Sequence, residues 1–296
     1  MKIAWKEKFM QGVFFIAACA SVLAVALICV FMFANGIPAI KEIGLIEFLS
    51  GETWRPSNNI YGILPMIVGS LYITAGAILI GVPIGILTSV FMAKYCPKRI
   101  YAPLKSATEL LAGIPSVIYG FFGIVVLVPV IRNCTRWLRV VGVLEKASKG
   151  SSILTASILL GIMILPTIIG VVESAIRAVP DAYYEGALAL GATHERSIFS
   201  VVLPAAKSGV VAGIVLGIGR AVGETMAVIM VAGNQARIPD SILQGVRTLT
   251  TNIVMEMGYA EGLHREALIA TAVVLFVFIL IINLSVSLIN RRGNHE

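Results

Sequence analysis

Two ionisable residues lie inside an apolar stretch of this sequence. Arg220 and Glu224 are four positions apart in GIGRAVGETMAV, and that spacing predicts that they share one face of a helix. If the stretch spans a membrane, an unpaired arginine at its centre costs about 2.5–3.5 kcal/mol, so both side chains should face protein or water. Either they form an ion pair that makes insertion tolerable, or Arg220 presents its planar donor fork to a passing anion while Glu224 orients it.

A second pair of polar residues, Ser116 and Tyr119, lies in LAGIPSVIYGFFG. Pro115 and the nearby glycines weaken or kink a helix, and such interruptions can expose backbone groups beside a cavity. Ser116 and Tyr119 would then be placed to hydrogen-bond a solute. The alternative interpretation is that the glycines serve close helix packing.

A polar segment, Glu185 to Pro204, separates two strongly apolar stretches. Asp181 is expected to cap a short helix, and Gly191 to end it in the left-handed conformation. Thr193 then caps a second short helix. Two short helices with a bend would offer a rigid knob to a partner, so we interpret residues 176–207 as a docking segment. The alternative is an ordinary polar loop.

The composition indicates a membrane protein. Hydrophobic residues make up 58% of the chain and charged residues only 13%, and the mean hydropathy is +0.93, which exceeds what a soluble domain can bury. A helix needs roughly 20 apolar residues to cross the hydrocarbon layer. We therefore predict an all-α integral membrane protein in which residues 1–296 form a single domain. The six expected transmembrane helices are residues 9–34, 61–92, 106–131, 152–172, 208–232 and 267–290.

Two polar regions between these spans have a recognisable pattern. In the last interval, Ile242, Val246, Leu249, Ile253 and Met257 recur at helical spacing beside a run of threonines, which predicts either a re-entrant segment lining a cavity or a cap on the bundle. In another interval, five basic residues gather: Arg132, Arg136, Arg139, Lys146 and Lys149. That interval is either a solvated loop or a surface that attracts anions or an acidic partner.

Patterns for catalysis, metal binding and nucleotide binding are missing from the sequence. The four cysteines and three histidines are scattered, without the spacing of a disulfide framework or a metal site. The phosphate-loop pattern G-x4-G-K-S/T does not occur, so the chain is not expected to hydrolyse ATP by that mechanism. We expect no catalytic residues, no metal and no cofactor bound by this chain.

The docking segment resembles the EAA signature of the membrane subunits of bacterial ABC importers, E-A-A-x3-G-x9-I-x-L-P. The spacing is intact, with Gly186 in place of the first alanine and Val201 in place of isoleucine. The resemblance implies that the segment couples the permease to an ATPase. The residues that match the signature or stand in for it are Glu185, Gly186, Ala187, Gly191, Leu203 and Pro204.

Three further segments, LAGIPSVIYGFFG, GRAVGETMAV and RTLTTNIVMEMG, resemble the permeases of phosphate-specific ABC importers, and the last is more similar to the PstC type of subunit than to the PstA type. This likeness covers nearly the whole chain. It implies a type I importer permease that moves inorganic phosphate. The candidate pathway residues remain the four singled out above from their chemistry, Arg220, Glu224, Ser116 and Tyr119. The likeness also implies a PstA-like second permease, two PstB-like ATPase subunits that use the ATP, and a PstS-like phosphate-binding protein.

The orientation follows from the resemblance more clearly than from charge, because Lys and Arg are divided almost evenly between the two sides. ABC ATPases are cytoplasmic, so the docking segment and both termini are expected in the cytoplasm, in a multi-pass protein of a bacterial inner membrane. The alternatives are a permease for another oxyanion such as sulfate or molybdate, a PstA-type subunit, and a membrane-embedded enzyme.

Overall fold

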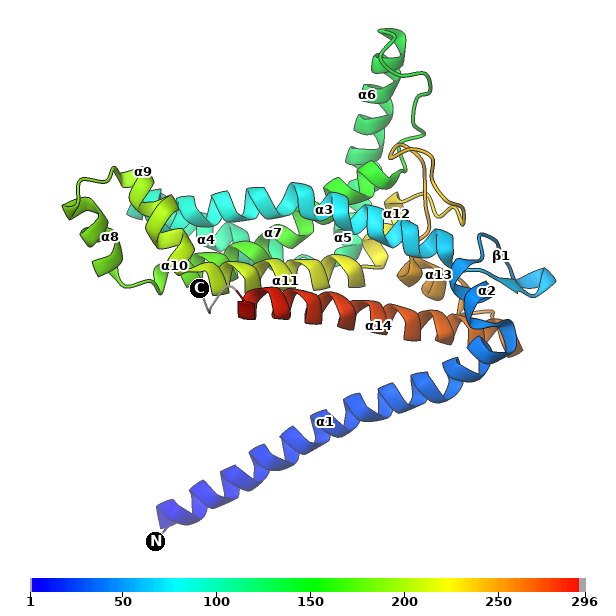
Figure 1. Cartoon of the computed structure of the whole chain (residues 1–296), viewed down its shortest axis with the longest axis horizontal. Coiled ribbons are helices and arrows are strands. Elements are labelled where there is room, and N and C mark those ends of the chain that lie inside the picture. Colours follow the sequence, from blue (N-terminus) through cyan, green and yellow to red (C-terminus); the bar gives the residue numbers. More distant parts are fainter. Residues whose placement is uncertain (1, 293–296) are drawn as a thin grey trace.

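The computed structural model describes residues 2–292, with side chains described from Lys6 to Ser285. Figure 1 shows a bundle of long helices with loops and short elements at its two ends. The long helices are α1 (Lys2–Ile43), α3 (Leu64–Val90), α4 (Lys98–Gly113), α6 (Val128–Val140), α7 (Ile153–Arg177), α11 (Lys207–Gly223) and α14 (Gly262–Arg292).

Short elements join these helices. The short α-helices are α2 (Leu45–Ser50), α5 (Ser116–Phe122), α8 (Asp181–Ala189), α9 (His194–Ser197), α10 (Leu203–Ala205), α12 (Met226–Val231) and α13 (Leu249–Glu256). The π-helical turns are η2 (Phe91–Tyr95), η3 (Gly123–Leu127) and η4 (Ile198–Val202), and the single 3-10 turn is η1 (Pro56–Asn58). A two-stranded antiparallel hairpin pairs β1 (Trp54–Arg55) with β2 (Ile60–Tyr61).

Helices α3, α7 and α11 form the centre of the bundle, and small residues let them pack closely. A side-chain carbon added at Gly81 of α3 would lie 2.7 Å from Ile164 Cδ1 and 2.8 Å from the Gly161 carbonyl oxygen of α7. A carbon added at Gly209 of α11 would meet the Cβ of Ala175. These glycines therefore serve helix packing, which is their usual role in membrane bundles.

Five helices in the described part of the chain are long and apolar enough to cross a membrane, and the number rises to six if a bent pair counts as one span. The bent pair is His194–Ala205 with Lys207–Gly223, at an angle of 72°. The predicted helical class is confirmed. The other candidate spans are Lys6–Ile43, Leu64–Tyr95, Ser116–Val140, Ile153–Arg177 and Gly262–Ser285.

Two expected spans differ from the observed helices. The span expected at 106–131 is divided, because α4 ends at Gly113 and α5 begins at Ser116. Pro115 has an extended backbone there, with ψ of 141°, so the anticipated interruption at Pro115 is a complete break. The span expected at 208–232 is also divided, between the end of α11 at Gly223 and the start of α12 at Met226.

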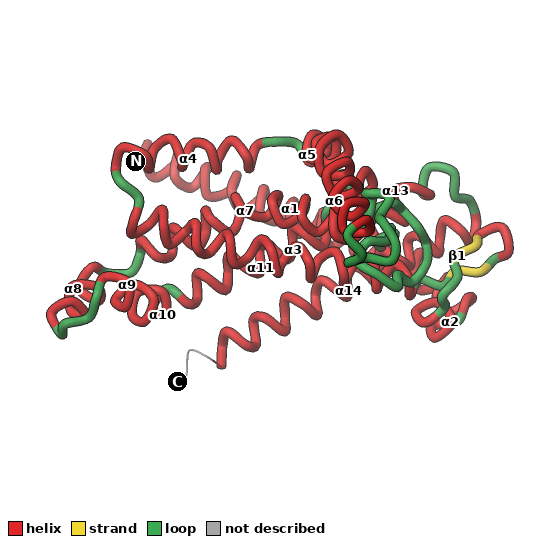
Figure 2. The backbone as a smooth tube through the Cα atoms, turned by 90° about the horizontal axis from the view of Figure 1, so that it is seen from above, coloured by secondary structure: helices red, strands yellow, loops and turns green. Residues whose placement is uncertain are grey.

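The bundle has two distinct ends (Figures 1 and 2). The docking end carries α8, α9 and α10; the opposite end carries α2, the β1–β2 hairpin, α13 and the loop that follows α6. Helix α1 contacts α14 near that opposite end, where Phe33 and Phe276 meet edge to face with ring centroids 6.0 Å apart. Towards its N-terminus α1 diverges from the bundle, and every described side chain from Lys6 to Ile28 is exposed.

Candidate functional site

Arg220 lies in the last turn of α11 and is half-buried. Tyr119, a buried residue of α5, lies within electrostatic range of Arg220. The Tyr119 hydroxyl donates a hydrogen bond to the Leu111 carbonyl oxygen at 2.8 Å, across the break at Pro115. The structure thus brings together two of the residues predicted for the pathway, and both stand beside interrupted helices.

Ser116 is half-buried in the first turn of α5. Its spacing of three from Tyr119 places it on the same side of that helix. The proton of Tyr119 already serves the Leu111 carbonyl, so only the lone pairs of its hydroxyl oxygen remain for another donor. Contact of either side chain with a solute remains a prediction.

The expectation that Arg220 and Glu224 share a helical face is wrong. Helix α11 ends at Gly223, and Glu224 has an extended backbone with φ −68° and ψ 130°. Its carboxylate accepts a hydrogen bond from the Ala227 amide at 3.1 Å, which satisfies one free amide in the first turn of α12, while Thr225 occupies the cap position. Among the side chains described, no ion pair joins Arg220 to Glu224, so the interpretation as a mutual ion pair fails.

The break at Glu224 is covered by α13. The Thr250 hydroxyl donates to the Glu224 carbonyl oxygen at 3.2 Å, and the Leu249 amide donates to Ser70 Oγ of α3 at 3.0 Å. Thr248 begins α13 with a capping box to Thr251, which satisfies the amides of its first turn. The segment expected to be re-entrant or a cap is therefore a short, buried helix fixed to both α3 and the interrupted span.

A cluster of polar contacts around the buried carboxylate of Glu256, at the C-terminal end of α13, was not predicted from the sequence. The Glu256 carboxylate accepts hydrogen bonds from Arg247 at 2.6 Å and from Trp54 Nε1 at 2.8 Å, and it contacts His264 Nε2 at 2.8 Å. Arg247 also donates to Asn252 Oδ1 at 3.0 Å. This cluster joins α13 to α14 and to the hairpin, because its members come from all three. The only signal in the sequence was a lone glutamate in a largely apolar helix.

The local structure of the docking segment is as predicted. A helix occupies Asp181–Ala189, Gly191 has a left-handed backbone with φ +85°, and Thr193 Oγ1 accepts the Arg196 amide at 3.3 Å to cap α9. The predicted cap by Asp181 is wrong, because Pro180 occupies the cap position. Asp181 lies in the first turn instead and pairs with Lys94 of η2 at 3.4 Å.

Most of the docking segment is accessible. Glu185, Gly186, Gly191 and Pro204 are exposed, Leu203 is half-buried and Ala187 is buried. Leu190 follows the last residue of α8 and lies outside the predicted spans, and its side chain is 92% exposed. Tyr183, Leu188 and Phe199 are further exposed apolar side chains of the same segment.

Aromatic and hydrogen-bond contacts attach the knob to the bundle. The Tyr184 hydroxyl lies 2.6 Å from His194 Nδ1, which links α8 to α9. The Tyr95 ring of η2 meets the His194 ring edge to face, with centroids 4.7 Å apart. The docking segment is therefore attached to η2, the π-helical turn at the end of α3.

A second buried acid, Glu173 of α7, lies near the docking end. Its carboxylate accepts from the Tyr101 hydroxyl at 2.6 Å, from Lys105 Nζ at 2.8 Å and from Arg177 Nε at 2.8 Å. Arg177 also donates to the Met92 carbonyl oxygen at 2.8 Å. The hydrogen bond to Glu173 holds the pKa of Lys105 above its ordinary value. This cluster joins α4, α7 and η2, and the sequence analysis did not predict it.

Residues 81–294 of the chain match the family described as the binding-protein-dependent transport system inner membrane component. The chain is 36% identical over 284 residues to the probable ABC transporter permease protein YqgH of Bacillus subtilis, with 92% of this chain and 89% of the relative covered. It is 35% identical over 265 residues to the phosphate transport system permease protein PstC of Mesorhizobium japonicum, with 86% and 81% covered.

The fold is similar to that of a chain in the crystal structure of a bacterial alginate ABC transporter in complex with an alginate pentasaccharide-bound periplasmic protein. The TM-score is 0.66, and the superposition covers 97% of each chain at 16% sequence identity. At this identity the likeness concerns the fold alone. The predicted type I importer permease fold is confirmed by this likeness and by the family match.

Proposed function

The chain belongs to the family of binding-protein-dependent transport system inner membrane components, and on that premise we propose that it is the PstC-type permease subunit of an ATP-driven inorganic phosphate importer. The similarity to the Mesorhizobium PstC protein, which extends over 86% of this chain, supports this substrate. A multi-pass membrane permease with helical spans is the architecture that such a subunit requires.

The observation that carries the proposal is the position of Arg220. The residue is half-buried at the end of a broken helix, within electrostatic range of Tyr119, and its guanidinium has no ion-pair partner among the described side chains. Broken helices within a membrane are characteristic of solute sites. A planar guanidinium matches the oxygens of a phosphate, so Arg220 would attract the anion while Ser116, Tyr119 and Glu224 complete the pathway.

The docking segment supports a coupling role. It exposes both the charge of Glu185 and the apolar side chain of Leu190, and Tyr95 of η2 contacts His194 at the start of α9. Such a knob fits a groove on an ATPase subunit. We infer that two PstB-like ATPase subunits bind ATP and drive transport, that a PstA-like permease completes the pathway, and that a PstS-like protein delivers phosphate. In this assembly the chain is a transport subunit, and ATP is bound by its partners.

The proposal includes a location and an orientation. With the ATPases in the cytoplasm, the docking end faces the cytoplasm, and both termini lie on that side of a bacterial inner membrane. In a variant without the four native cysteines, a cysteine added beyond Arg292 should then be unreactive towards an impermeant thiol reagent in intact cells. Labelling in intact cells would contradict the orientation.

Phosphate uptake into vesicles that contain this chain and its candidate partners tests the function. Accumulation of phosphate that requires ATP supports an importer. Competition by excess sulfate or molybdate would instead identify a permease for another oxyanion. Turnover of a lipid phosphate or a peptide by the purified chain alone would replace the transporter by an enzyme.

A further inference from the structure

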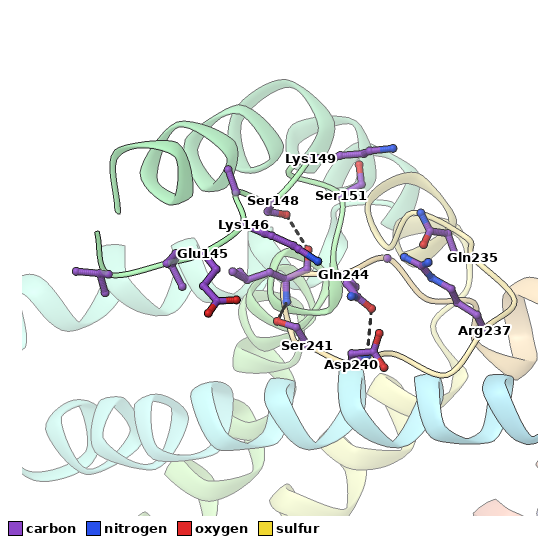
Figure 3. Close-up of a pocket in the computed structure, with 15 residues that line it drawn as sticks. Glu145, Lys146, Ser148, Lys149, Ser151, Gln235, Arg237, Asp240, Ser241 and Gln244 are labelled. Atoms are coloured by element: carbon purple, nitrogen blue, oxygen red, sulfur yellow. Dashed lines mark hydrogen bonds between the residues drawn. The ribbon is translucent and has the colours of Figure 1, made fainter. Parts of the chain in front are cut away.

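A cavity of about 850 Å³ opens at the end of the bundle opposite the docking segment. Its two walls are the segment between α6 and α7 and the segment between α12 and α13 (Figure 3). Five charged side chains line it: Glu145, Lys146, Lys149, Arg237 and Asp240. Figure 3 shows Lys146 and Arg237 reaching from opposite walls toward the space between them.

Backbone hydrogen bonds hold the two walls together. The Ile153 amide donates to the Gln244 carbonyl oxygen at 2.9 Å, and the Leu154 amide donates to the Ile242 carbonyl oxygen at 3.0 Å. The Ser148 hydroxyl donates to the Leu243 carbonyl oxygen at 2.8 Å. The cavity is thus built by two segments of one chain that are hydrogen-bonded to each other.

The charges in the cavity are available to a ligand. Within the described part of the chain, none of the five charged side chains forms an ion pair. Lys146, Lys149 and Arg237 bring three positive charges against the two carboxylates of Glu145 and Asp240. The balance favours an anion, because a concave site of one net sign raises the local concentration of the opposite charge.

The acceptors in the cavity restrict which anion fits. The side chain of Asp240 lines the cavity and is exposed. The carboxylate of Asp240 is an acceptor only. Hydrogen phosphate and dihydrogen phosphate carry P–OH groups that can donate to such oxygens, whereas sulfate at neutral pH carries none. The cavity therefore suits a protonated oxyanion.

The cavity also adjoins the interrupted span. The wall that carries Gln235 and Arg237 runs from the end of α12 to the start of α13, and α13 covers the break at Glu224 through Thr250. The segment that forms this wall of the cavity thus leads directly into α13, the helix that covers the break at Glu224.

We propose that this cavity is a binding site for a protonated oxyanion, separate from Arg220, in which Lys146 and Arg237 attract the anion and the Asp240 carboxylate accepts from its hydroxyl. The inference rests on the proposed function for its choice of phosphate as the anion. It adds a site at the end opposite the docking segment, which an anion occupies before it reaches the broken helix.

Equilibrium binding of radiolabelled inorganic phosphate to the purified full chain in nanodiscs tests the site. We expect saturable binding that persists in Arg220→Met and that excess sulfate does not displace. Lys146→Gln with Arg237→Gln should weaken Kd at least tenfold. The matched control, Arg136→Gln with Arg139→Gln, removes the same charge from exposed positions of α6 outside the cavity and should change Kd less than twofold.

Asp240→Asn tests the acceptor. It should reduce the preference for phosphate over sulfate, because one acceptor oxygen of the carboxylate is replaced by an amide that donates. Should the double variant fail to fold, the single variants Lys146→Gln and Arg237→Gln carry the same comparison. Absence of saturable binding in wild type, an equal loss in both pairs of variants, or full displacement by sulfate would overturn the proposal.

The outcomes separate this inference from the proposed function. An assembled complex that accumulates phosphate while the chain shows no binding in the cavity leaves the function intact and removes only the outer site. A chain that binds phosphate in the cavity within a complex that accumulates none keeps the site and contradicts the function.

Discussion

The hydroxyl of Thr250 donates to the backbone carbonyl oxygen of Glu224 across 3.2 Å. This bond joins α13 to the point at which α11 ends and α12 begins. The carbonyl of Glu224 would otherwise lie at a helix end without a donor, and an unpaired carbonyl is costly in an apolar environment. The interrupted span is therefore stabilised by an element that follows it in the sequence.

We predict that Thr250→Val destabilises the purified chain by about 1 kcal/mol, the usual net value of one hydrogen bond. Thr88→Val is the matched control, because the Thr88 hydroxyl bonds only to the Ile84 carbonyl oxygen of its own helix. Thermal unfolding in detergent measures both. Equal unfolding midpoints for the two variants would show that the bond to Glu224 contributes nothing.

The second prediction concerns Arg220. Arg220→Met should insert as well as wild type, because a charge leaves the apolar layer, yet it should abolish phosphate uptake. Arg220→Lys should restore only part of it, since an ammonium lacks the planar fork. Uptake is compared at matched membrane abundance.

The absence of an Arg220–Glu224 ion pair sharpens this test. The double change Arg220→Met with Glu224→Gln should remain inactive, because Glu224 accepts from an amide in the first turn of α12 and does not neutralise the arginine. Substantial transport by the double variant would eliminate a direct role of Arg220 toward the anion.

The third prediction concerns the docking segment. Gly191→Val places a β-branched residue at φ +85°, which costs about 1–3 kcal/mol and should reshape the knob. Gly142→Val is the control, since Gly142 has φ +82° and open space but lies in the loop after α6. Gly191→Val should reduce co-purification with the ATPase, whereas Gly142→Val should not.

Glu185→Lys tests the same surface without backbone strain. It reverses an exposed charge on α8, so insertion and folding should be unchanged while transport-stimulated ATP hydrolysis falls. Normal co-purification and normal hydrolysis in both Gly191→Val and Glu185→Lys would contradict the coupling role.

The fourth prediction concerns pH and Lys105. Its pKa is raised by the hydrogen bond to Glu173, so the contact stabilises the fold while the lysine is charged and is lost as pH rises through the raised pKa. The ordinary lysine pKa is about 10.4. The difference in unfolding midpoint between wild type and Lys105→Met should therefore stay constant from about pH 6 to 9 and shrink only above about pH 10.4. A difference that shrinks near neutral pH would refute this assignment.

The fifth prediction concerns Glu256. Glu256→Gln removes the charge that faces Arg247 and His264, and loss of one partner from a buried pair costs about 3–5 kcal/mol. Glu52→Gln, at an exposed position, should be nearly neutral. Thermal unfolding distinguishes the two, and similar midpoints would mean that the cluster does not stabilise the fold.

The docking segment could be predicted from sequence because local chemistry determines it. Gly191 tolerates the left-handed backbone and Thr193 supplies a cap, so neither depends on distant residues. The end of α11 could not be predicted in this way. Its boundary depends on Thr250, a residue 26 positions further along the chain, and helical spacing alone extended the helix through Glu224.

The contacts around the buried carboxylates of Glu173 and Glu256 could not be predicted from the sequence for the same reason. Trp54 and Glu256 are 202 positions apart, and Tyr101 and Glu173 are 72 apart. Each carboxylate has ordinary neighbours in sequence and acquires its partners only when the helices pack. Composition predicted the helices and their membrane environment, whereas the contacts between them required the structure.

The Glu173 cluster has a mechanical consequence. One carboxylate ties α4 to α7, and Arg177 ties α7 to η2, which in turn contacts the knob through Lys94 and Tyr95. Moving any one of these elements alone would strip donors from a buried charge. A displacement of the docking segment is therefore coupled to α4, α7 and η2 through contacts that share this one buried carboxylate.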